Sequence, residues 1–287
     1  MKKPPAWFRS TMAALSLIAP PLAAAIAWRL FWWLGDPAPV RAADRATHEQ
    51  AVTGRIDVRG ASVVTYRWGD PARPAIILVH GWRSRGSRFS AIVRALVDRG
   101  YCVRAFDAPG NGDSGGTRTV IYDYATAIRV IAAEHHDVAG VLGHSFGAVA
   151  SAIALRRGVV SPVLVTVSGV YDFDFIVRQF IENIGLRERA ARRFRSRVDQ
   201  LRHEPGVGEL IEGDLWNDIV TRVHSADIRI LAIHDESDTS VPLTQAESIV
   251  AAHRGPVALE RTRGLGHSAL LADDAVVTRI VEEFTRA

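Results

Sequence analysis

Short apolar segments that alternate with helical patterns constrain the fold of this 287-residue chain more than any other feature of its sequence. The clearest segment, AIILV at residues 75–79, has no polar position, which is typical of a strand covered on both faces. Seven more strands are predicted, at residues 56–58, 63–68, 102–106, 138–142, 163–167, 228–233 and 257–260. Helices are predicted at residues 89–97, 122–133, 146–156 and 269–284. The alternation predicts an α/β fold: a mostly parallel eight-stranded sheet with helices on both faces.

The interval between Gly169 and Ile228 breaks this alternation, because its 58 residues are too many for one crossover helix. It predicts a helical cap insertion at about residues 170–227. Arginines dominate its first half, and its second half is acidic, with Glu204, Glu209, Glu212, Asp214 and Asp218. The arginines form either a basic face for an anionic lipid or substrate, or a solvated helix that pairs in part with the acidic stretch.

The N-terminal part of the chain is apolar and basic. Residues 11–34 contain one charge, Arg29, near their end. A helix of 24 residues, at about 1.5 Å per residue, spans the roughly 30 Å hydrocarbon core of a bilayer, and membrane helices tolerate the kink that Pro20 and Pro21 would cause. We therefore expect residues 1–35 to form a membrane anchor with a single span. The basic residues before the span favour a main domain on the non-cytoplasmic side.

Two alternatives remain for this segment. Residues 23–27 could supply the cleavage site of a signal peptide, so that residues 1–35 would be a removed signal segment and the mature protein would be secreted. The segment could also be a buried helix of a soluble protein. Residues 36–50 contain Pro37 and Pro39, which oppose helix, and predict a linker before a main domain at residues 51–287.

Charge and cysteine content limit the partners and cofactors. Residues 1–35 hold four of the 35 basic residues and no acidic residue, so the other 31 basic residues balance the 31 acidic ones. Because the rest of the chain has no excess positive charge, we expect no nucleic-acid partner. The single cysteine, Cys102, excludes an internal disulfide and a cysteine-clustered metal site. No motif for a metal, a nucleotide or a flavin occurs, so we expect no cofactor.

The motif Gly143-His144-Ser145-Phe146-Gly147 carries the strongest chemical signal in the sequence. It follows a predicted strand directly and precedes a predicted helix directly. Gly-x-Ser-x-Gly in this strand–turn–helix context is typical of a nucleophile elbow, in which the glycines allow a tight turn and the serine hydroxyl is exposed at the sheet edge. Ser145 is therefore the candidate nucleophile.

Together with two further motifs, this elbow makes residues 60–287 resemble the α/β-hydrolase family. The strand at 75–79 runs into His80-Gly81-Trp82, which is similar to the oxyanion-loop motif of the family, and residues 106–114 resemble its Asp-x-Pro-Gly-x-Gly-x-Ser loop. The resemblance implies the α/β-hydrolase fold with a cap. It also implies an oxyanion hole formed by the backbone N–H groups of Trp82 and Phe146.

The same resemblance implies a Ser–acid–His triad whose last two members follow Ser145. The family pattern places the acid three residues before Val-Pro, which selects Asp238 over its neighbours Asp235 and Glu236. The base is expected between the last strand and the last helix, where His267 stands. The other histidines are weaker candidates: His80 and His144 are expected to shape loops, His253 falls in a predicted helix, and the adjacent pair His135–His136 lacks the spacing of a helical metal site.

These residues predict a serine hydrolase that cleaves a carboxylic ester or thioester of a small-molecule acyl substrate through an acyl-enzyme. The resemblance implies that relatives acting on haloalkanes or epoxides carry an aspartate at the position of Ser145, which argues against those reactions here. An amidase or peptidase, or an acyltransferase, could use the same triad. A non-catalytic binding protein with the hydrolase fold is the alternative outside the enzymes.

Three arginines, Arg83, Arg85 and Arg88, follow the oxyanion-loop motif. Arg83 and Arg85 are candidates for binding a substrate carboxylate or phosphate near the reaction centre. They could equally be exposed positions of an arginine-rich protein.

Overall fold

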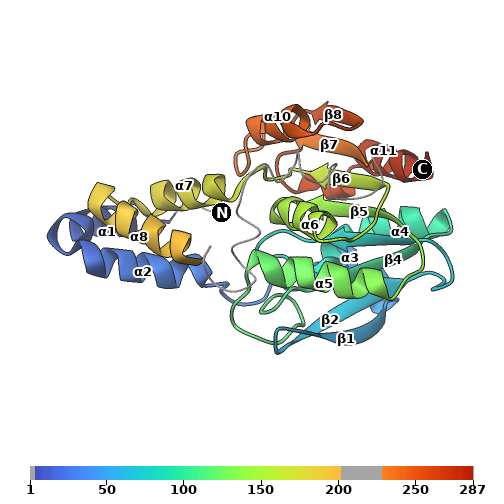
Figure 1. Cartoon of the computed structure of the whole chain (residues 1–287), viewed down its shortest axis with the longest axis horizontal. Helices are drawn as coiled ribbons and strands as arrows, with labels where there is room; N and C mark the ends of the chain where they lie inside the picture. The colour runs from blue at the N-terminus through green and yellow to red at the C-terminus, as the bar shows by residue number, and fades with distance from the viewer. Residues whose placement is uncertain (1–3, 202–227, 287) are drawn as a thin grey trace. The chain divides into compact units, whose positions relative to one another are not determined.

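The computed structural model describes residues 4–201 and 228–286 (Figure 1). The chain divides into two compact units. Within the described residues, the helical unit consists of residues 4–33 and 172–201, and the sheet unit of residues 34–171 and 228–286.

The sheet unit is built on one eight-stranded sheet with the strand order β1-β2-β4-β3-β5-β6-β7-β8. The first two pairings, β1 with β2 and β2 with β4, are antiparallel, and all the others are parallel. The strands are β1 (Val52–Val58), β2 (Ala61–Trp68), β3 (Ala75–Val79), β4 (Cys102–Phe106), β5 (Val138–His144), β6 (Val163–Val167), β7 (Arg229–Asp235) and β8 (Val257–Thr262). The predicted mostly parallel eight-stranded sheet is therefore confirmed.

Helices cover both faces of this sheet (Figure 1). On one face, α4 and α11 pack against each other, and on the opposite face α5 packs against α6. The helices and 3₁₀ turns of the unit are α3 (Ala42–Glu49), η1 (Gly86–Phe89), α4 (Ser90–Asp98), α5 (Ile121–Ala133), α6 (Phe146–Arg156), α10 (Leu243–Ala252), η4 (Ala269–Ala272) and α11 (Asp274–Thr285). Residues 42–49 are thus helical, in a stretch where the prolines predict a linker.

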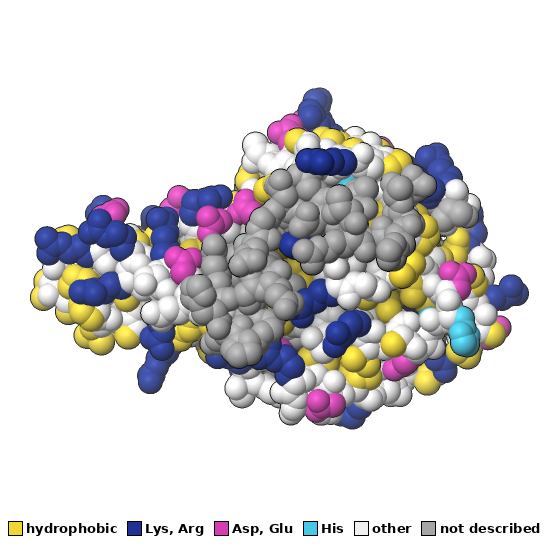
Figure 2. Space-filling model, in the orientation of Figure 1, with side chains coloured by type: hydrophobic (Ala, Val, Ile, Leu, Met, Phe, Trp, Pro, Cys, Tyr) yellow, Lys and Arg dark blue, Asp and Glu magenta, His cyan; other side chains and the backbone are white. Residues whose placement is uncertain are grey.

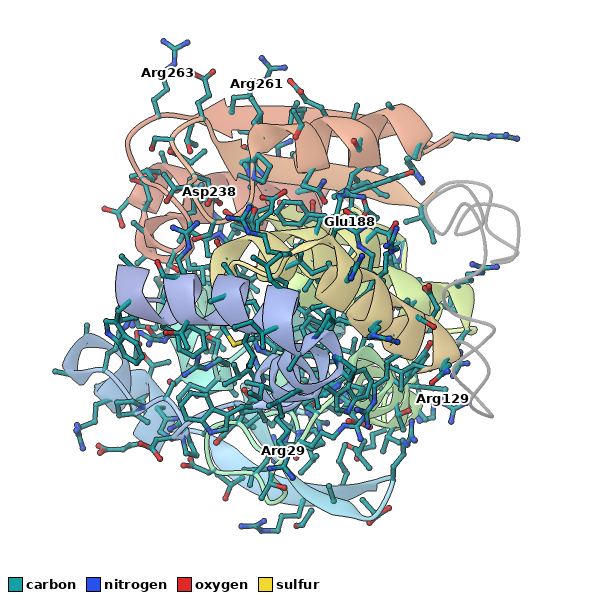
Figure 3. All side chains as sticks on the ribbon, turned by 90° about the vertical axis from the view of Figure 1, so that its left-hand side faces the viewer. Arg29, Arg129, Glu188, Asp238, Arg261 and Arg263 are labelled. Carbon is teal, nitrogen blue, oxygen red and sulfur yellow. The ribbon has the colours of Figure 1, made fainter. Side chains whose placement is uncertain are left out.

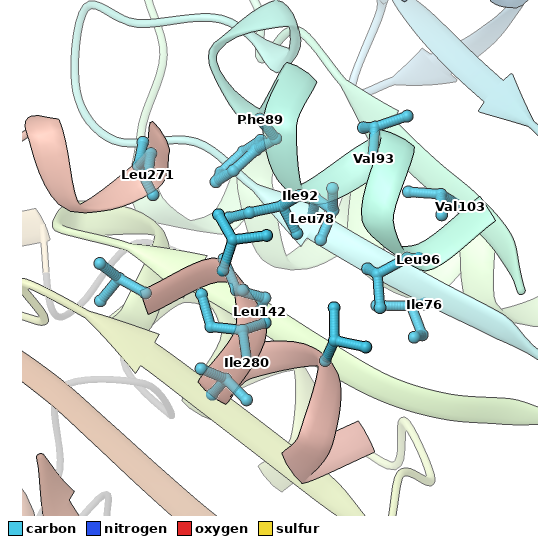
Figure 4. Close-up of a cluster of buried hydrophobic side chains, with 14 of the residues drawn as sticks. Ile76, Leu78, Phe89, Ile92, Val93, Leu96, Val103, Leu142, Leu271 and Ile280 are labelled. Atoms are coloured by element: carbon cyan, nitrogen blue, oxygen red, sulfur yellow. The ribbon is translucent and has the colours of Figure 1, made fainter. Parts of the chain in front are cut away.

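The main hydrophobic core lies between the sheet and the pair α4–α11 (Figure 4). Alternate residues of β3, Ile76 and Leu78, face α4 there, and all five side chains of β3 are fully buried. The other three side chains of β3, those of Ala75, Ile77 and Val79, face the opposite helix layer. The strand is apolar throughout because helices cover both of its faces.

The helical unit consists of α1 (Ala6–Ile18), α2 (Pro20–Trp32), α7 (Phe173–Ile184) and α8 (Glu188–Gln200). Its core is aromatic: the ring of Phe31 in α2 lies 5.0 Å from that of Phe180 in α7 and 5.4 Å from that of Phe194 in α8. The guanidinium of Arg197 lies 4.5 Å from the ring centroid of Trp28. The face of this unit seen in Figure 2 carries Lys or Arg side chains beside apolar ones. Leu17 and Ile18 are among the exposed apolar residues of the unit.

The expectation of one spanning helix over residues 11–34 is wrong. The chain leaves the helical conformation at Ala19, with φ −138° and ψ 68°, and a new helix begins at Pro20. Proline lacks a backbone N–H and disfavours the helical conformation of the residue before it, but it fits the first turn of a helix. Each helix has 13 residues, about 20 Å at 1.5 Å per residue. Within residues 4–201 and 228–286, no helix has the length and apolar character needed to cross a bilayer.

Two helices of the predicted cap, α7 and α8, belong to the helical unit. Asp172 caps α7 by accepting a hydrogen bond from the backbone N–H of Phe175, and Gly185 ends it in the left-handed conformation. The arginines of α8 include Arg192, whose guanidinium lies 3.3 Å from Glu188 one turn earlier. The acidic stretch from Glu204 to Asp218 lies outside the described residues, so its predicted pairing with these arginines stays a prediction.

We expect Gly140→Ala to destabilise the sheet unit by about 1–3 kcal/mol, because buried overpacking costs about that much. A Cβ atom at Gly140 in β5 would lie 2.2 Å from a ring carbon of Phe284, a buried residue of α11. Gly115→Ala is the matched control, since a Cβ atom there meets its nearest atom, the carbonyl oxygen of Ser62, at 3.5 Å. Urea unfolding measures both. Equal midpoints for the two variants would contradict the packing argument.

Candidate active site

The turn between β5 and α6 holds Ser145 at the carboxyl end of the sheet. Its backbone has φ 55° and ψ −119°, a strained conformation for a residue with a side chain, and its N–H donates to the carbonyl of Val167 on β6 at 2.9 Å. A Cβ atom at Gly143 would lie 2.5 Å from Cα of Ala148, and one at Gly147 would lie 2.2 Å from the carbonyl oxygen of Val79. Both glycines are therefore required for α6 to lie this close to β3 and β5.

Asp238 and His267 form a hydrogen-bonded pair. The Nδ1–H group of His267 donates to Oδ2 of Asp238 at 2.7 Å, with the tautomer assigned from this bond. Asp238 is 8 % exposed and also accepts from the backbone N–H groups of Ser240 and Val241. Burial raises the pKa of Asp238, but the hydrogen bonds from His267 and the backbone outweigh it and hold this pKa below its usual value.

The neighbouring carboxylates of Asp238 do other work. Asp235, fully buried at the end of β7, accepts hydrogen bonds from the hydroxyls of Ser237 and Thr262 and from the N–H of Leu265. It therefore fastens the loop that leads to His267. Glu236 pairs instead with Arg263 at 2.7 Å, and Figure 3 shows Arg263 extending outward from the surface. Of the three carboxylates, Asp238 is the one with a hydrogen bond to His267.

A pocket of about 210 Å³ brings Ser145 and His267 together. Its lining residues are Arg41, Asp44, Gly81, Trp82, Arg83, Ser84, Arg88, His144, Ser145, His267, Ser268, Leu271 and Ala272. All of them belong to the sheet unit. The nucleophile and base that the sequence predicts, 122 residues apart in the chain, thus lie in one cavity at the sheet edge.

His144 holds the backbone of His267 in place through a hydrogen bond. Its Nε2–H group donates to the backbone carbonyl of His267 at 2.9 Å, and the two rings lie 4.9 Å apart. Burial and the nearby His267 lower the pKa of His144 to about 3, so its ring is neutral in the physiological range. His144 therefore holds the loop of His267 without adding charge to the pocket, in line with the loop-shaping role that the sequence predicts.

The loop at residues 80–82 lies directly over the elbow. A Cβ atom at Gly81 would lie 3.1 Å from Cβ of Ser145, and the rings of Trp82 and Phe146 meet edge to face at 5.3 Å. His80 fixes the loop from the inside: it is fully buried, its Nε2 accepts from the N–H of Ala108 at 2.9 Å, and burial lowers its pKa. The two residues expected to form the oxyanion hole are thus neighbours of Ser145.

The structure separates the two arginines expected to bind substrate. Arg83 lines the pocket, whereas Arg85 is not among the lining residues. Arg85 is 3 % exposed; its guanidinium donates to Asp113 at 2.5 Å and to the carbonyl of Ala38 at 3.1 Å, and lies 3.5 Å from Asp107. The expectation that Arg85 binds substrate is therefore corrected. Its side chain points into the protein toward the buried carboxylate of Asp107 and links its own loop to those of Ala38 and Asp113.

The remaining histidines with expectations lie away from the pocket. His253 is buried against the carbonyl of Ile228, and His135 contacts the guanidinium of Arg104 at 2.6 Å. In the described parts of the chain, no group of three or more His, Cys, Asp or Glu side chains could hold a metal ion.

Sequence reasoning missed two charged residues of the pocket, Arg41 and Asp44. Both lie at the start of α3, in the stretch expected to be a linker. The signal available was Asp44 itself, an acidic residue in the first turn of a short helix, but the prolines before it concealed the helix.

Comparisons with known proteins agree with this fold. The model of a family described as the alpha/beta hydrolase family matches residues 76–279. The uncharacterized hydrolase YugF of Bacillus subtilis strain 168 is 33% identical over 97 residues, which are 32% of this chain and 35% of YugF. The chain thus aligns with about a third of that relative.

Similar solved structures share the fold at low sequence identity. One comes from work on carboxylesterases of the ammonia-oxidizing thaumarchaeon Nitrososphaera gargenis, with a TM-score of 0.59 and 15% identity over 82% of this chain and 98% of the other. Another is Est1E of Butyrivibrio proteoclasticus, solved with ferulic acid, with a TM-score of 0.57 and 15% identity over 81% of this chain and 96% of the other.

We expect Asp235→Asn to destabilise the protein at pH 7 by about 2 kcal/mol, because it weakens charged hydrogen bonds that fasten the base loop. Burial raises the pKa of Asp235, but the hydrogen bonds from Ser237, Thr262 and the loop backbone lower it by more. The pKa of Asp235 therefore lies well below its usual value. The unfolded chain therefore binds the proton more readily. The contribution of Asp235 is complete above the unfolded value of about 3.9 and is lost as the pH falls through the folded value.

The measurement is the free energy of unfolding in urea between pH 7 and pH 2.5. The difference between wild type and Asp235→Asn should shrink below about pH 4. Glu236→Gln, which changes an exposed carboxylate one residue away, is the control and should stay close to wild type. A difference that is constant over the whole range would show that the ionised form of Asp235 is not what stabilises the loop.

Proposed function

Because the chain belongs to the alpha/beta hydrolase family, whose model covers residues 76–279, we propose that it is a serine hydrolase that cleaves a carboxylic ester or thioester through an acyl-enzyme. One observation carries the proposal. Ser145 and His267 line the same pocket, and Nδ1 of His267 is hydrogen-bonded to the buried carboxylate of Asp238 at 2.7 Å. A histidine oriented by a carboxylate beside a serine supports activation of the serine hydroxyl.

The reaction divides into two steps. The Oγ atom of Ser145 attacks the carbonyl carbon while Nε2 of His267 accepts the hydroxyl proton, and the same proton passes to the leaving alcohol or thiol as its bond to carbon breaks. Water then attacks the acyl-enzyme with His267 again as base, which releases the acid and restores Ser145. Asp238 keeps Nδ1 of His267 protonated, so that Nε2 is free to act, and stabilises the imidazolium that forms.

The negative charge on the carbonyl oxygen is stabilised by the backbone N–H groups of Trp82 and Phe146. Two features support this assignment: the loop at Gly81 touches Ser145, and Phe146 is the first residue of α6, where the helix dipole favours negative charge. One such donor contributes about 3 kcal/mol in comparable sites. Because the donors belong to the backbone, Trp82→Ala would retain them.

The first test is covalent labelling with a fluorophosphonate probe, which reacts with activated serines. We expect the wild-type protein to be labelled and Ser145→Ala to be unlabelled, because the variant lacks the hydroxyl oxygen that the probe modifies. Ser248→Ala is the control: the hydroxyl of Ser248 bonds within α10 to the carbonyl of Thr244, and its loss should leave labelling intact. A folded wild-type protein that remains unlabelled would favour a non-catalytic binding protein instead.

The second test separates Asp238 from its neighbour. Asp238→Asn should lower kcat for a p-nitrophenyl ester by about 10³-fold or more, since an asparagine can favour the wrong tautomer of His267 and cannot stabilise the imidazolium. Glu236→Gln should change kcat by less than about threefold, because Glu236 pairs with the exposed Arg263. Circular dichroism checks that both variants fold. If Glu236→Gln has the larger effect, the assignment of the acid is wrong.

A further inference from the structure

Among the described residues that line the pocket around Ser145, positive charges outnumber negative ones. Arg41, Arg83 and Arg88 line it, and Asp44 is the one carboxylate among the lining residues that the structure describes. Arg41 and Arg83 are exposed, so water and salt screen their charges. Arg88 is different, because its side chain is largely covered.

Arg88 lies in the turn η1 (Gly86–Phe89), directly before α4. Its Nη1 atom is buried and has no hydrogen-bond partner among the described residues. Arg85, three residues earlier, has its guanidinium bonded to Asp113 and Ala38 and placed beside Asp107. The same short turn thus sends one arginine to a buried carboxylate of the protein and leaves the other with an unused donor at the pocket.

The carboxylate in the pocket does not supply the missing partner. Asp44 accepts a hydrogen bond from the hydroxyl of Ser90 at 2.5 Å through Oδ1, and its Oδ2 is buried with no partner among the described residues. Within the described chain, therefore, no hydrogen bond joins this oxygen to Nη1 of Arg88. A buried guanidinium N–H that is left unbonded is costly, so a ligand that accepts from it gains much of that cost back.

We infer that Arg88, assisted by Arg41 and Arg83, binds a carboxylate carried by the substrate, so that the enzyme acts on esters of negatively charged acids or alcohols. The part of the inference that concerns ester cleavage rests on the proposed serine hydrolase function. The planar guanidinium matches a carboxylate through two parallel hydrogen bonds. A dianionic phosphate fits less well, because Asp44 adds a negative charge to the same pocket.

The experiment compares esters that differ in one carboxylate. For the acyl side the pair is 4-nitrophenyl hydrogen adipate and 4-nitrophenyl hexanoate, and for the leaving-group side it is 4-acetoxybenzoate and phenyl acetate. The readout is the ratio of kcat/KM for the charged ester over its neutral partner. We expect Arg88→Gln to lower this ratio by about 10- to 100-fold in at least one pair, mainly through KM, since hydrogen bonds to charged groups contribute on that scale.

Two further variants serve as controls. Arg88→Lys keeps the charge but loses the planar fork, so the ratio should fall to an intermediate value. Arg99→Gln removes one positive charge from an exposed position at the end of α4, outside the pocket, and should leave the ratio unchanged. An unchanged ratio in both ester pairs for Arg88→Gln, or an equal fall for Arg99→Gln, would overturn the inference.

A binding measurement keeps this result separate from the proposed function. Calorimetric titration of the Ser145→Ala protein with monomethyl adipate reports recognition of the carboxylate without turnover. We expect binding that weakens about tenfold or more when Arg88→Gln is added. Such binding in a protein whose wild type neither hydrolyses esters nor reacts with a fluorophosphonate would retain the anion site and refute the hydrolase. Binding that does not depend on Arg88 would refute the anion site.

Discussion

The close approach of α6 to the ends of β3 and β5 is the constraint on which the site depends. Gly147 lies so near the carbonyl of Val79 that any side chain would push the helix away. With the helix in place, the chain must turn within one residue, and that residue, Ser145, takes a conformation that side chains rarely adopt. The position of the serine is thus a consequence of helix-to-strand packing that leaves the turn no other path.

Two neighbouring buried carboxylates at this sheet edge have different roles because their hydrogen-bond partners differ. Asp235 and Asp238 are three residues apart, and hydrogen bonds hold the pKa of each below its usual value. The partners of Asp235 are hydroxyls and backbone N–H groups of the loop before His267, so it acts on the backbone. Asp238 meets the imidazole ring itself. One carboxylate positions the loop and the other orients the ring that the loop carries.

The sheet and the elbow could be predicted from the sequence because their signals are local. A run such as AIILV predicts a strand that is covered on both faces. Two glycines that flank a serine directly after a strand predict the tight turn of a nucleophile elbow. The N-terminal segment was harder, because apolar residues pack equally well against lipid or against protein, and only the position of Pro20 hinted at two helices. The roles of Arg85 and Arg88 could not be predicted, since a 3₁₀ turn and a buried partner, Asp107, decide which side chain turns inward.

The helical unit joins the beginning of the chain to a segment that follows much later. Phe31 is covered by Phe180 and Phe194, about 150 residues further along. During synthesis at roughly 5–20 residues per second, α1 and α2 leave the ribosome on the order of ten seconds before their partners exist. Until α7 and α8 are synthesised, the face of α2 that carries Phe31 has none of the aromatic partners that cover it in the folded protein.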